Sequence, residues 1–367
     1  MNKSISTVPL LSLIVLLTAC SQSGSVNQNR TTSTSSPAVA PTVMPEEGFV
    51  YTANERGNSI SAIDVSTGQV KHIATRITPH NVQVSRDGRL LLAVGPVADM
   101  TANKSTMKMT DVGKMARGRL LILDAEALAV ETAADIEIGR HPAHVVIDAQ
   151  GKRAYATNSE DNNVLVIDVA QKQVIGEINT GKFPHGLRMS PNGREIYVAN
   201  VNDNSVSVID IMHSKEVAHI PVGKAPVQVS FTPDGGRAYV SLRDENNVAV
   251  INTAQHKKVA TIAVGRNPIQ VFVTPDGRYV YVANQGTEAD PDNTVSLIDT
   301  ETNNVIATIK TGKGAHGVVV SDDGKRAFIA NIVDNTVSVI DTATQKVIKN
   351  IKVGEGPNGI TFRGANR

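Results

Sequence analysis

The sequence predicts an all-β fold, a seven-bladed β-propeller made of four-stranded antiparallel blades. Three observations favour this fold. One stretch of sequence occurs in seven copies, tight-turn glycines recur at a regular interval, and the strand that is missing from the first repeat is found after the last one. Four short strands per repeat at this period are typical of propeller blades, which stack into a closed ring.

The repeated stretch is clearest at Tyr197–Asp210, which reads YVANVNDNSVSVID. Its alternating β-branched runs, bounded by Gly, Pro, Asn and Asp, are typical of antiparallel strands joined by tight turns. An interrupted copy runs from Leu91 to Asp124. Close copies begin at Tyr51, Tyr155, Tyr239, Tyr281 and Phe328.

Each repeat contains four strand-like runs. An Asn-Gly or Asp-Gly pair closes the first hairpin, where glycine supplies the positive φ that the turn needs. The turn glycines are evenly spaced at Gly151, which follows Gln150, and at Gly193, Gly235 and Gly277. In the clearest copy we expect strands at Gly186–Ser190, Glu195–Asn200, Ser205–Ile211 and Glu216–Pro221.

The ends of the chain predict how the ring closes. The first complete strand, Phe49–Asn54, corresponds to the second strand of a blade. The missing first strand is Asn358–Phe362, near the other end. The C-terminal strand is therefore expected to complete the N-terminal blade, because an open array would leave two sheet edges bare.

Residues 1–19 are predicted to be a lipoprotein signal peptide. Lys3 precedes an apolar run, Pro9–Leu17, that is too short to span a bilayer. The run ends in Leu17-Thr18-Ala19-Cys20, which resembles a bacterial lipobox, and this resemblance implies that Cys20 is acylated after cleavage. The alternative is an ordinary secretory signal with an incidental cysteine.

The chain is thus expected to have three parts: the signal peptide, a flexible linker at residues 20–45 and the propeller at residues 46–367. The linker is rich in Ser, Thr and Pro and cannot bury enough apolar surface to fold. Ser21, rather than Asp, follows the cysteine, which implies anchoring in the outer membrane, facing the periplasm. We expect contact with the membrane through the lipid and no transmembrane helix in the mature chain.

Composition gives little support to a nucleic-acid partner. The formal net charge is +1, so bulk electrostatics indicate neither nucleic acid nor a membrane surface. Aromatic residues make up 3% of the chain and Trp is absent, which leaves few side chains to stack on unpaired bases.

The motifs YVAN, NTVSVID and Val-Gly, repeated from Gly48 to about Gly364, resemble those of the YVTN-repeat (YncE-like) propellers. WD40 propellers are a poorer match, since no copy carries a Trp-Asp pair. The resemblance implies a seven-bladed ring outside the cytoplasm. The same repeat also occurs in haem-dependent nitrite reductases and in methylamine dehydrogenase, so it implies no single chemistry.

Function is expected on one face of the ring. The loops between second and third strands share this face with the connections between blades, and loops on a rigid scaffold often carry function. Its largest loop is Pro96–Arg117, and most histidines fall in the connections or at the start of the innermost strands. The candidate ligand- or partner-binding residues are His80, Asn81, His144, His185, Gln228, Gln270, His316 and Asn358.

Three interpretations of this face remain open. It is a docking surface for an envelope protein or a small molecule, since Met side chains adapt to varied partners. Alternatively, imidazoles and thioethers bind copper, or the histidines bind a haem-type cofactor. In the third interpretation the histidines only bond neighbouring loop carbonyls. The candidate metal ligands are Met100, Met107, Met109, Met115, His185 and His316.

The docking surface is our hypothesis: a lipid-anchored binding scaffold outside the cytoplasm rather than an enzyme. The sequence contains no nucleophile elbow, phosphate-binding loop or HExxH zinc motif, so no catalytic residue is predicted. The resemblance to YncE-like propellers adds single-stranded DNA binding as a further alternative, which the charge and the scarcity of aromatic residues argue against.

Overall fold

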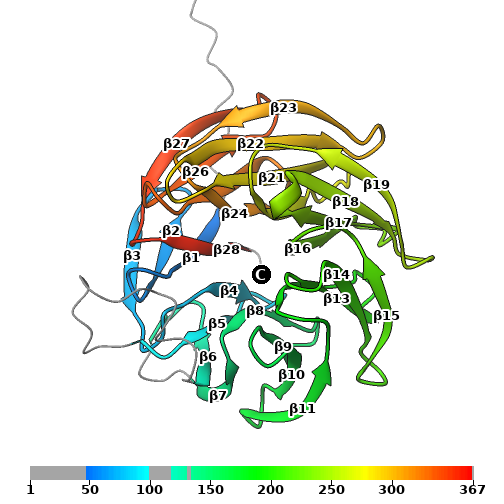
Figure 1. Cartoon of the computed structure of the whole chain (residues 1–367). Helices are drawn as coiled ribbons and strands as arrows, with labels where there is room; N and C mark the ends of the chain where they lie inside the picture. The colour runs from blue at the N-terminus through cyan, green and yellow to red at the C-terminus, as the bar shows by residue number, and fades with distance from the viewer. Residues whose placement is uncertain (1–46, 99–116, 130–133, 366–367) are drawn as a thin grey trace, which may run out of the picture. The chain divides into compact units, whose positions relative to one another are not determined.

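The computed structural model describes residues 47–98, 117–129 and 134–365 of the chain. Within these ranges the strands form seven antiparallel sheets of four strands each. The sheets follow one another around a ring in chain order, from blue to red in Figure 1. The predicted all-β, seven-bladed propeller is therefore confirmed.

The sheets are called blades 1 to 7 here, each given from its innermost strand outward. Blade 1 contains β28 (Pro357–Gly364), β1 (Gly48–Asn54), β2 (Ser59–Asp64) and β3 (Val70–Ala74). Blade 2 contains β4 (Asn81–Val84), β5 (Leu90–Pro96), β6 (Arg117–Asp124) and β7 (Ala134–Arg140). Blade 3 contains β8 (Pro142–Ile147), β9 (Arg153–Asn158), β10 (Asn163–Asp168) and β11 (Gln173–Asn179). Blade 4 contains β12 (Pro184–Met189), β13 (Glu195–Asn200), β14 (Ser205–Asp210) and β15 (Lys215–Pro221).

The remaining blades repeat the same order. Blade 5 contains β16 (Pro226–Phe231), β17 (Arg237–Leu242), β18 (Asn247–Asn252) and β19 (Lys257–Ala263). Blade 6 contains β20 (Pro268–Val273), β21 (Tyr279–Gly286), β22 (Pro291–Asp299) and β23 (Asn304–Lys310). Blade 7 contains β24 (Ala315–Val320), β25 (Arg326–Asn331), β26 (Thr336–Asp341) and β27 (Lys346–Lys352). None of the helical segments in the described ranges is long and apolar enough to cross a membrane.

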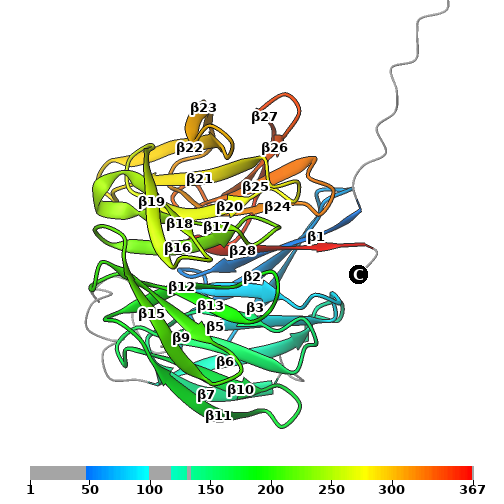
Figure 2. The ribbon, with the colours of Figure 1, turned by 90° about the vertical axis from the view of Figure 1, so that its right-hand side faces the viewer.

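Blade 1 is built from both ends of the described chain. β28 pairs antiparallel with β1, with Val50 opposite Phe362 and Thr52 opposite Ile360. The two strands lie side by side in both views (Figures 1 and 2). The ring of Phe362 also stacks on Phe328 of blade 7, with centroids 5.8 Å apart. The predicted closure of the ring by the C-terminal strand is confirmed.

The predicted limits of the strands in blade 4 are close to those observed. The second strand was expected at Glu195–Asn200, which is the range of β13. The innermost strand was expected at Gly186–Ser190, whereas β12 begins earlier, at Pro184. The pairing of β12 with β13 shifts register between Pro184 and Leu187, so the chain joins the sheet before regular alternation begins. His185, the residue after Pro184, therefore belongs to the strand and not to the connection before it.

The asparagine of the YVAN motif ties the second strand of a blade to the third. Asn200 is fully buried, and its Nδ2 donates to Oγ of Ser205 at 3.0 Å and to Oγ of Ser207 at 2.9 Å. Such bonds satisfy a polar group that would otherwise be buried at a cost in free energy. A Cβ on Gly181, in the preceding connection, would lie 2.7 Å from the same Nδ2. Corresponding pairs of bonds are made by Asn54, Asn284 and Asn331.

Candidate metal centre

A repeated corner in the backbone positions the candidate residues at one end of the innermost strands. His141 and Phe183 have left-handed φ angles of 51° and 57°, each directly before the proline that opens β8 or β12. Proline then fixes φ of the first strand residue near −65°. The chain therefore turns sharply into the strand, and the residues after the proline lie at the mouth of the central channel. The same corner occurs at Ala225, Asn267 and Gly356, and in blade 7 the left-handed residue Gly314 precedes Ala315 instead of a proline.

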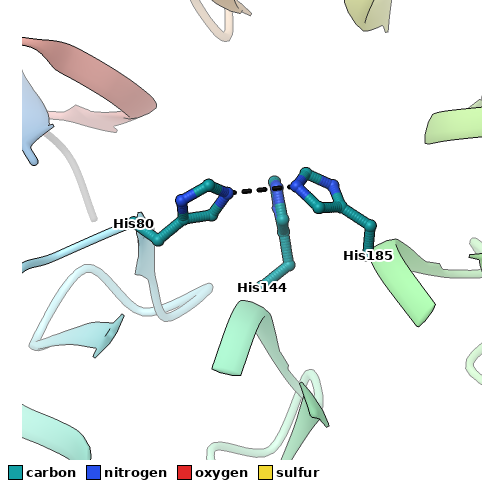
Figure 3. Close-up of side chains that lie close together, drawn as sticks. All are labelled: His80, His144 and His185. Carbon is teal, nitrogen blue, oxygen red and sulfur yellow. Dashed lines mark hydrogen bonds between the residues drawn. The ribbon is translucent and has the colours of Figure 1, made fainter. Parts of the chain in front are cut away.

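Three histidines from consecutive blades converge at this mouth. His80 directly precedes β4, His144 lies on β8 and His185 lies on β12. One ring nitrogen from each lies within 4.8 Å of those of the other two. Figure 3 shows the three rings turned toward one another. We call these residues the three-histidine cluster.

The hydrogen-bond partners assign the ring hydrogens of His80 and His185. Nδ1 of His80 lies 3.3 Å from Oε1 of Glu55, and Nδ1 of His185 lies 3.3 Å from the carbonyl oxygen of Val227. Both oxygens only accept, so each Nδ1 carries a hydrogen and each Nε2 turns its lone pair inward. The two Nε2 atoms are 3.1 Å apart. Because two lone pairs repel at this distance, a proton or another cation has to lie between them.

Glu55 supplies negative charge beside the cluster. Burial opposes its ionisation, but the charge of His80 and hydrogen bonds from His80 and Asn358 outweigh this and lower the pKa of Glu55 to about 2. Nδ2 of Asn358 donates to Oε2 of Glu55 at 2.7 Å. An ionised carboxylate in this position stabilises a cation held by the histidines.

The remaining imidazoles are kept neutral. Burial, followed by the positive charge of neighbouring histidines, lowers the pKa of His144 and of His185 well below the ordinary value. Burial likewise lowers the pKa of His316 to about 4. Neutral imidazole is the form that binds metal ions, so these side chains need not lose a proton at neutral pH before binding.

His144 has a ring nitrogen without a partner. Its side chain is buried, and its Nε2 makes no hydrogen bond within the described residues. On the other side of the ring, Nε2 of Gln228 lies 3.3 Å from Nδ1 of His144 and acts as the donor. A buried nitrogen of this kind costs free energy unless another group uses it, which indicates that the cluster is built for a ligand.

The structure joins five of the predicted binding residues and gives two others a structural role. His80, His144, His185, Gln228 and Asn358 are connected by the contacts described above and by the contact of Asn358 Nδ2 with His80 Nδ1 at 3.3 Å. In contrast, the side-chain oxygens of Asn81 and Gln270 accept backbone N–H groups of the next innermost strand, at Val145 and Val318.

His316 lies outside the three-histidine cluster. It is buried, and its Nδ1 has no partner among the described residues. Together with His185 and His141 it lines a cavity of about 220 Å³ at the mouth. The four candidate thioether ligands lie outside the described residues, so their placement beside the histidines stays a prediction: Met100, Met107, Met109 and Met115.

The sequence analysis missed Glu55. It lies in the turn between β1 and β2, at a position where other copies of the repeat carry uncharged residues such as Val201 and Ile332. Glu55 is the single acidic residue at this repeat position, where Arg243 is the other charged residue, and that carboxylate was the available signal. Its contact with His80 also shows that the β1–β2 turn and the connection between blades lie on the same face, as the sequence predicted.

Three family models match parts of the chain. Residues 235–358 match the Cytochrome D1 heme domain, residues 176–276 match the YNCE-like beta-propeller, and residues 124–225 match the seven-bladed beta-propeller lactonase model. The Uncharacterized protein YncE of Escherichia coli O157:H7 is 27% identical over 126 residues, which are 34% of this chain and 33% of that protein.

Solved structures share the fold. Hydrazine synthase of Kuenenia stuttgartiensis superposes with a TM-score of 0.65 at 20% identity, over 78% of this chain and 95% of that chain. A functionally unknown protein from Desulfotomaculum acetoxidans DSM 771 has a TM-score of 0.70 at 17% identity, over 86% and 99% of the two chains. At these identities the likeness concerns the fold alone. The ring of seven four-stranded blades makes the chain a seven-bladed β-propeller, and the partial family matches show that it is similar to YncE-like propellers.

Proposed function

We propose that this propeller is a binding protein that holds one transition-metal ion at the mouth of its channel, ligated by His80, His144 and His185. The observation that carries the proposal is the 3.1 Å separation of the His80 and His185 Nε2 atoms, whose rings both commit Nδ1 to an acceptor. Two lone pairs directed at one point require a proton or a metal ion between them, and in this proposal a metal ion takes that place. His144 supplies the third nitrogen once the hydrogen on its Nε2 moves to Nδ1.

The donor set favours a late first-row ion. Imidazole nitrogens suit Zn²⁺, Ni²⁺ and Cu²⁺, whereas Mg²⁺ and Ca²⁺ prefer oxygen ligands. Affinity for divalent ions of this row is highest for Cu²⁺, so copper is the most sensitive probe. Three protein ligands leave a coordination position open. A donor group from a small molecule or an envelope protein would bind there, which makes the metal part of the proposed docking surface.

Equilibrium dialysis of the purified chain, stripped of metal and then exposed to Cu²⁺ or Zn²⁺, tests the proposal. We expect one ion per chain by elemental analysis, and a loss of affinity of at least about 100-fold in His144→Ala and in His185→Ala, since removing even a partner of a ligand costs 10–100-fold. His213→Ala is the matched control, because His213 is exposed and pairs with Asp210. Substoichiometric binding, or equal affinity in all variants, would refute the metal centre.

A haem-type cofactor is a second candidate. The match of residues 235–358 to a haem-domain model favours it, and imidazole is a common haem ligand. The cavity beside His185 and His316 measures about 220 Å³, below the roughly 300–1,000 Å³ of typical small-molecule and cofactor sites. The described residues therefore fit an ion better than a macrocycle. A haem absorption band in the purified chain, lost in His185→Ala, would reverse this preference.

We also propose that the chain is anchored in the outer membrane, facing the periplasm, through an acylated Cys20. The support is the sequence Leu17-Thr18-Ala19-Cys20 and the serine that follows it, all of which lie outside the described residues. Mass spectrometry of the N-terminal peptide should show an acylated cysteine at position 20. A cleaved but unacylated N-terminus would instead support the ordinary secretory signal.

A further inference from the structure

Arg188 places a guanidinium inside the channel. It follows His185 by three residues on β12. Its Nη1 lies 3.4 Å from Oε1 of Gln83 on β4, and its Cζ lies 5.9 Å from the ring centroid of Phe272 on β20. These strands belong to blades 4, 2 and 6. A group that contacts three alternate blades of a seven-bladed ring lies near the axis of the ring.

The guanidinium lacks a counter-ion in the protein. Among the described residues Arg188 has no ion-pair partner, and Gln83 accepts one long hydrogen bond from it. A guanidinium has five N–H donors, so most of them remain to be satisfied. Burial lowers the pKa of Arg188 to about 10, which still leaves it charged at neutral pH. A half-buried charge without a counter-ion is costly, and an anion would supply the missing acceptors.

The other blades offer no charge at this level of the channel. The turn glycine after the innermost strand defines the equivalent positions in blades 2, 3, 5, 6 and 7, and in blade 1 the equivalent residue lies four positions after Pro357. The residues at these positions are uncharged: Gln83, Val146, Ser230, Phe272, Val319 and Thr361. A single arginine at an otherwise uncharged repeat position was a signal that the sequence analysis missed. Among the described residues at this position of the innermost strands, Arg188 is therefore the one cation.

The charge of Arg188 also reaches the metal centre. Arg188 follows the candidate ligand His185 by three residues on the same strand, β12, which brings its charge near the three-histidine cluster. A metal ion at the cluster and the guanidinium would repel each other. An anion between or beside them would be attracted to both, so metal and anion should bind cooperatively.

We propose that the channel binds a small planar oxyanion, such as a carboxylate, through the guanidinium of Arg188, directly inside the three-histidine cluster. Arginine suits this ligand class because its fork of N–H donors matches two carboxylate oxygens. The cooperative part of the inference rests on the proposed metal function. Binding of the anion by Arg188 does not, because the guanidinium is present without the metal.

Formate serves as the probe, with chloride at the same ionic strength as the reference. Titration calorimetry of the purified chain should show that formate strengthens Cu²⁺ binding by about 5-fold or more, within the usual range of coupling between sites. In Arg188→Gln the effect of formate should vanish, while Cu²⁺ binding in chloride tightens because a positive charge is removed. Arg188→Lys keeps the charge without the fork and should retain a smaller effect.

A metal-free experiment separates the two proposals. Formate should raise the unfolding temperature of the wild-type chain relative to chloride, because a ligand that binds only the folded state stabilises it. Arg188→Gln should show no such shift, whereas Arg89→Gln, which alters an exposed arginine, should behave like the wild type. A formate effect that is absent from the wild type or equal in Arg188→Gln overturns the anion site. Loss of Cu²⁺ binding alongside an intact formate effect overturns only the metal centre.

Discussion

Glu55 accepts a hydrogen bond from Nδ1 of His80 at 3.3 Å, while its other carboxylate oxygen accepts one from Asn358 at 2.7 Å. Asn358 lies on β28, the strand that closes the ring, and Glu55 lies in the first turn of the propeller. The carboxylate therefore links ring closure to the orientation of His80. The candidate centre can form only after the two ends of the propeller have paired.

Replacement of Glu55 by Gln should weaken the metal centre. The amide keeps the size of the side chain but removes the charge that stabilises a cation and fixes the hydrogen on His80 Nδ1. Loss of such a partner of a metal ligand usually lowers affinity by about 10–100-fold. The same Cu²⁺ dialysis measures this. Glu195→Gln is the matched control, because Glu195 binds Nε2 of His256 outside the cluster.

The same variant should change acid stability. The pKa of Glu55 is about 2 in the folded chain and 4.5 ordinarily, so its stabilisation is complete above pH 4.5 and is lost as the pH falls toward 2. This lowering of the pKa of Glu55 corresponds to a contribution of roughly 3 kcal/mol to the free energy of unfolding. Denaturant unfolding of metal-free protein at pH 5 and pH 3 should show a smaller loss of stability in Glu55→Gln than in the wild type. An equal loss would contradict the pairing.

Gln228 sets the tautomer of His144, and its replacement by Glu should tighten metal binding. Oε1 of Gln228 accepts the N–H of Val229 at 2.9 Å, which leaves its Nε2 to donate to His144 Nδ1. The metal requires the opposite arrangement, with the hydrogen on Nδ1. A carboxylate would accept that hydrogen, so we expect Cu²⁺ affinity to rise by about 10-fold or more.

The metal-free Gln228→Glu protein should in turn be less stable, because a carboxylate is then buried beside a neutral ring. Gln270→Glu is the matched control. Gln270 occupies the same position in the next blade, and its side-chain oxygen accepts the N–H of Val318. Its side-chain nitrogen, unlike that of Gln228, makes no hydrogen bond to a histidine of the described residues. A decrease of Cu²⁺ affinity in Gln228→Glu would show that His144 does not bind through Nε2.

The fold was predictable because its signals are local. The blades follow from the alternation of apolar residues with a period of two and from the turn glycines. The closure of the ring follows from the position of Asn358–Phe362, a first strand that lies at the other end of the chain. The same alignment brought the histidines to one face. It could not determine that His80, His144 and His185 meet while His316 remains apart, because distances across the ring depend on its radius and on side-chain rotamers.

The chemistry of the site was less predictable for a related reason. The hydrogen on His185 depends on the carbonyl of Val227, and that on His80 depends on Glu55, and both partners come from other blades. The backbone carbonyl of Val227 leaves no trace in the repeat pattern, whereas Glu55 is marked only by its charge at that repeat position. Three consecutive blades bring the rings of His80, His144 and His185 into contact, a convergence that the spacing of the histidines in the sequence does not reveal.

His316 should make the folded chain sensitive to mild acid. Its pKa is about 4 in the fold, because burial and the charge of His80 outweigh the opposing charge of Glu55, and 6.5 ordinarily. The unfolded chain therefore binds a proton that the folded chain does not between these values, and stability falls as the pH drops from 6.5 toward 4. His316→Asn should reduce the slope by about 1.4 kcal/mol per pH unit.

Urea unfolding of metal-free protein at several pH values between 4.5 and 6.5 gives this slope. His213→Asn, at an exposed site, is the control and should leave it nearly unchanged. An unchanged slope in His316→Asn would mean that the imidazole is already solvated in the folded state.

Gly312 should tolerate no side chain, because it packs against the asparagine of the repeat. A Cβ at this position would lie 2.7 Å from Nδ2 of Asn331, a fully buried amide that donates to Thr336 at 2.9 Å and to Ser338 at 2.8 Å. The amide cannot withdraw without breaking both bonds. Gly312→Ala should therefore lower the free energy of unfolding by about 1–3 kcal/mol.

Gly176→Ala is the control, because the atom nearest to a Cβ at Gly176 is 3.7 Å away. Denaturant titration should show no loss of stability in this variant and a gain of up to about 1 kcal/mol. Equal stabilities of the two variants would show that the glycine of the connection between blades and the asparagine of the repeat are not coupled by packing.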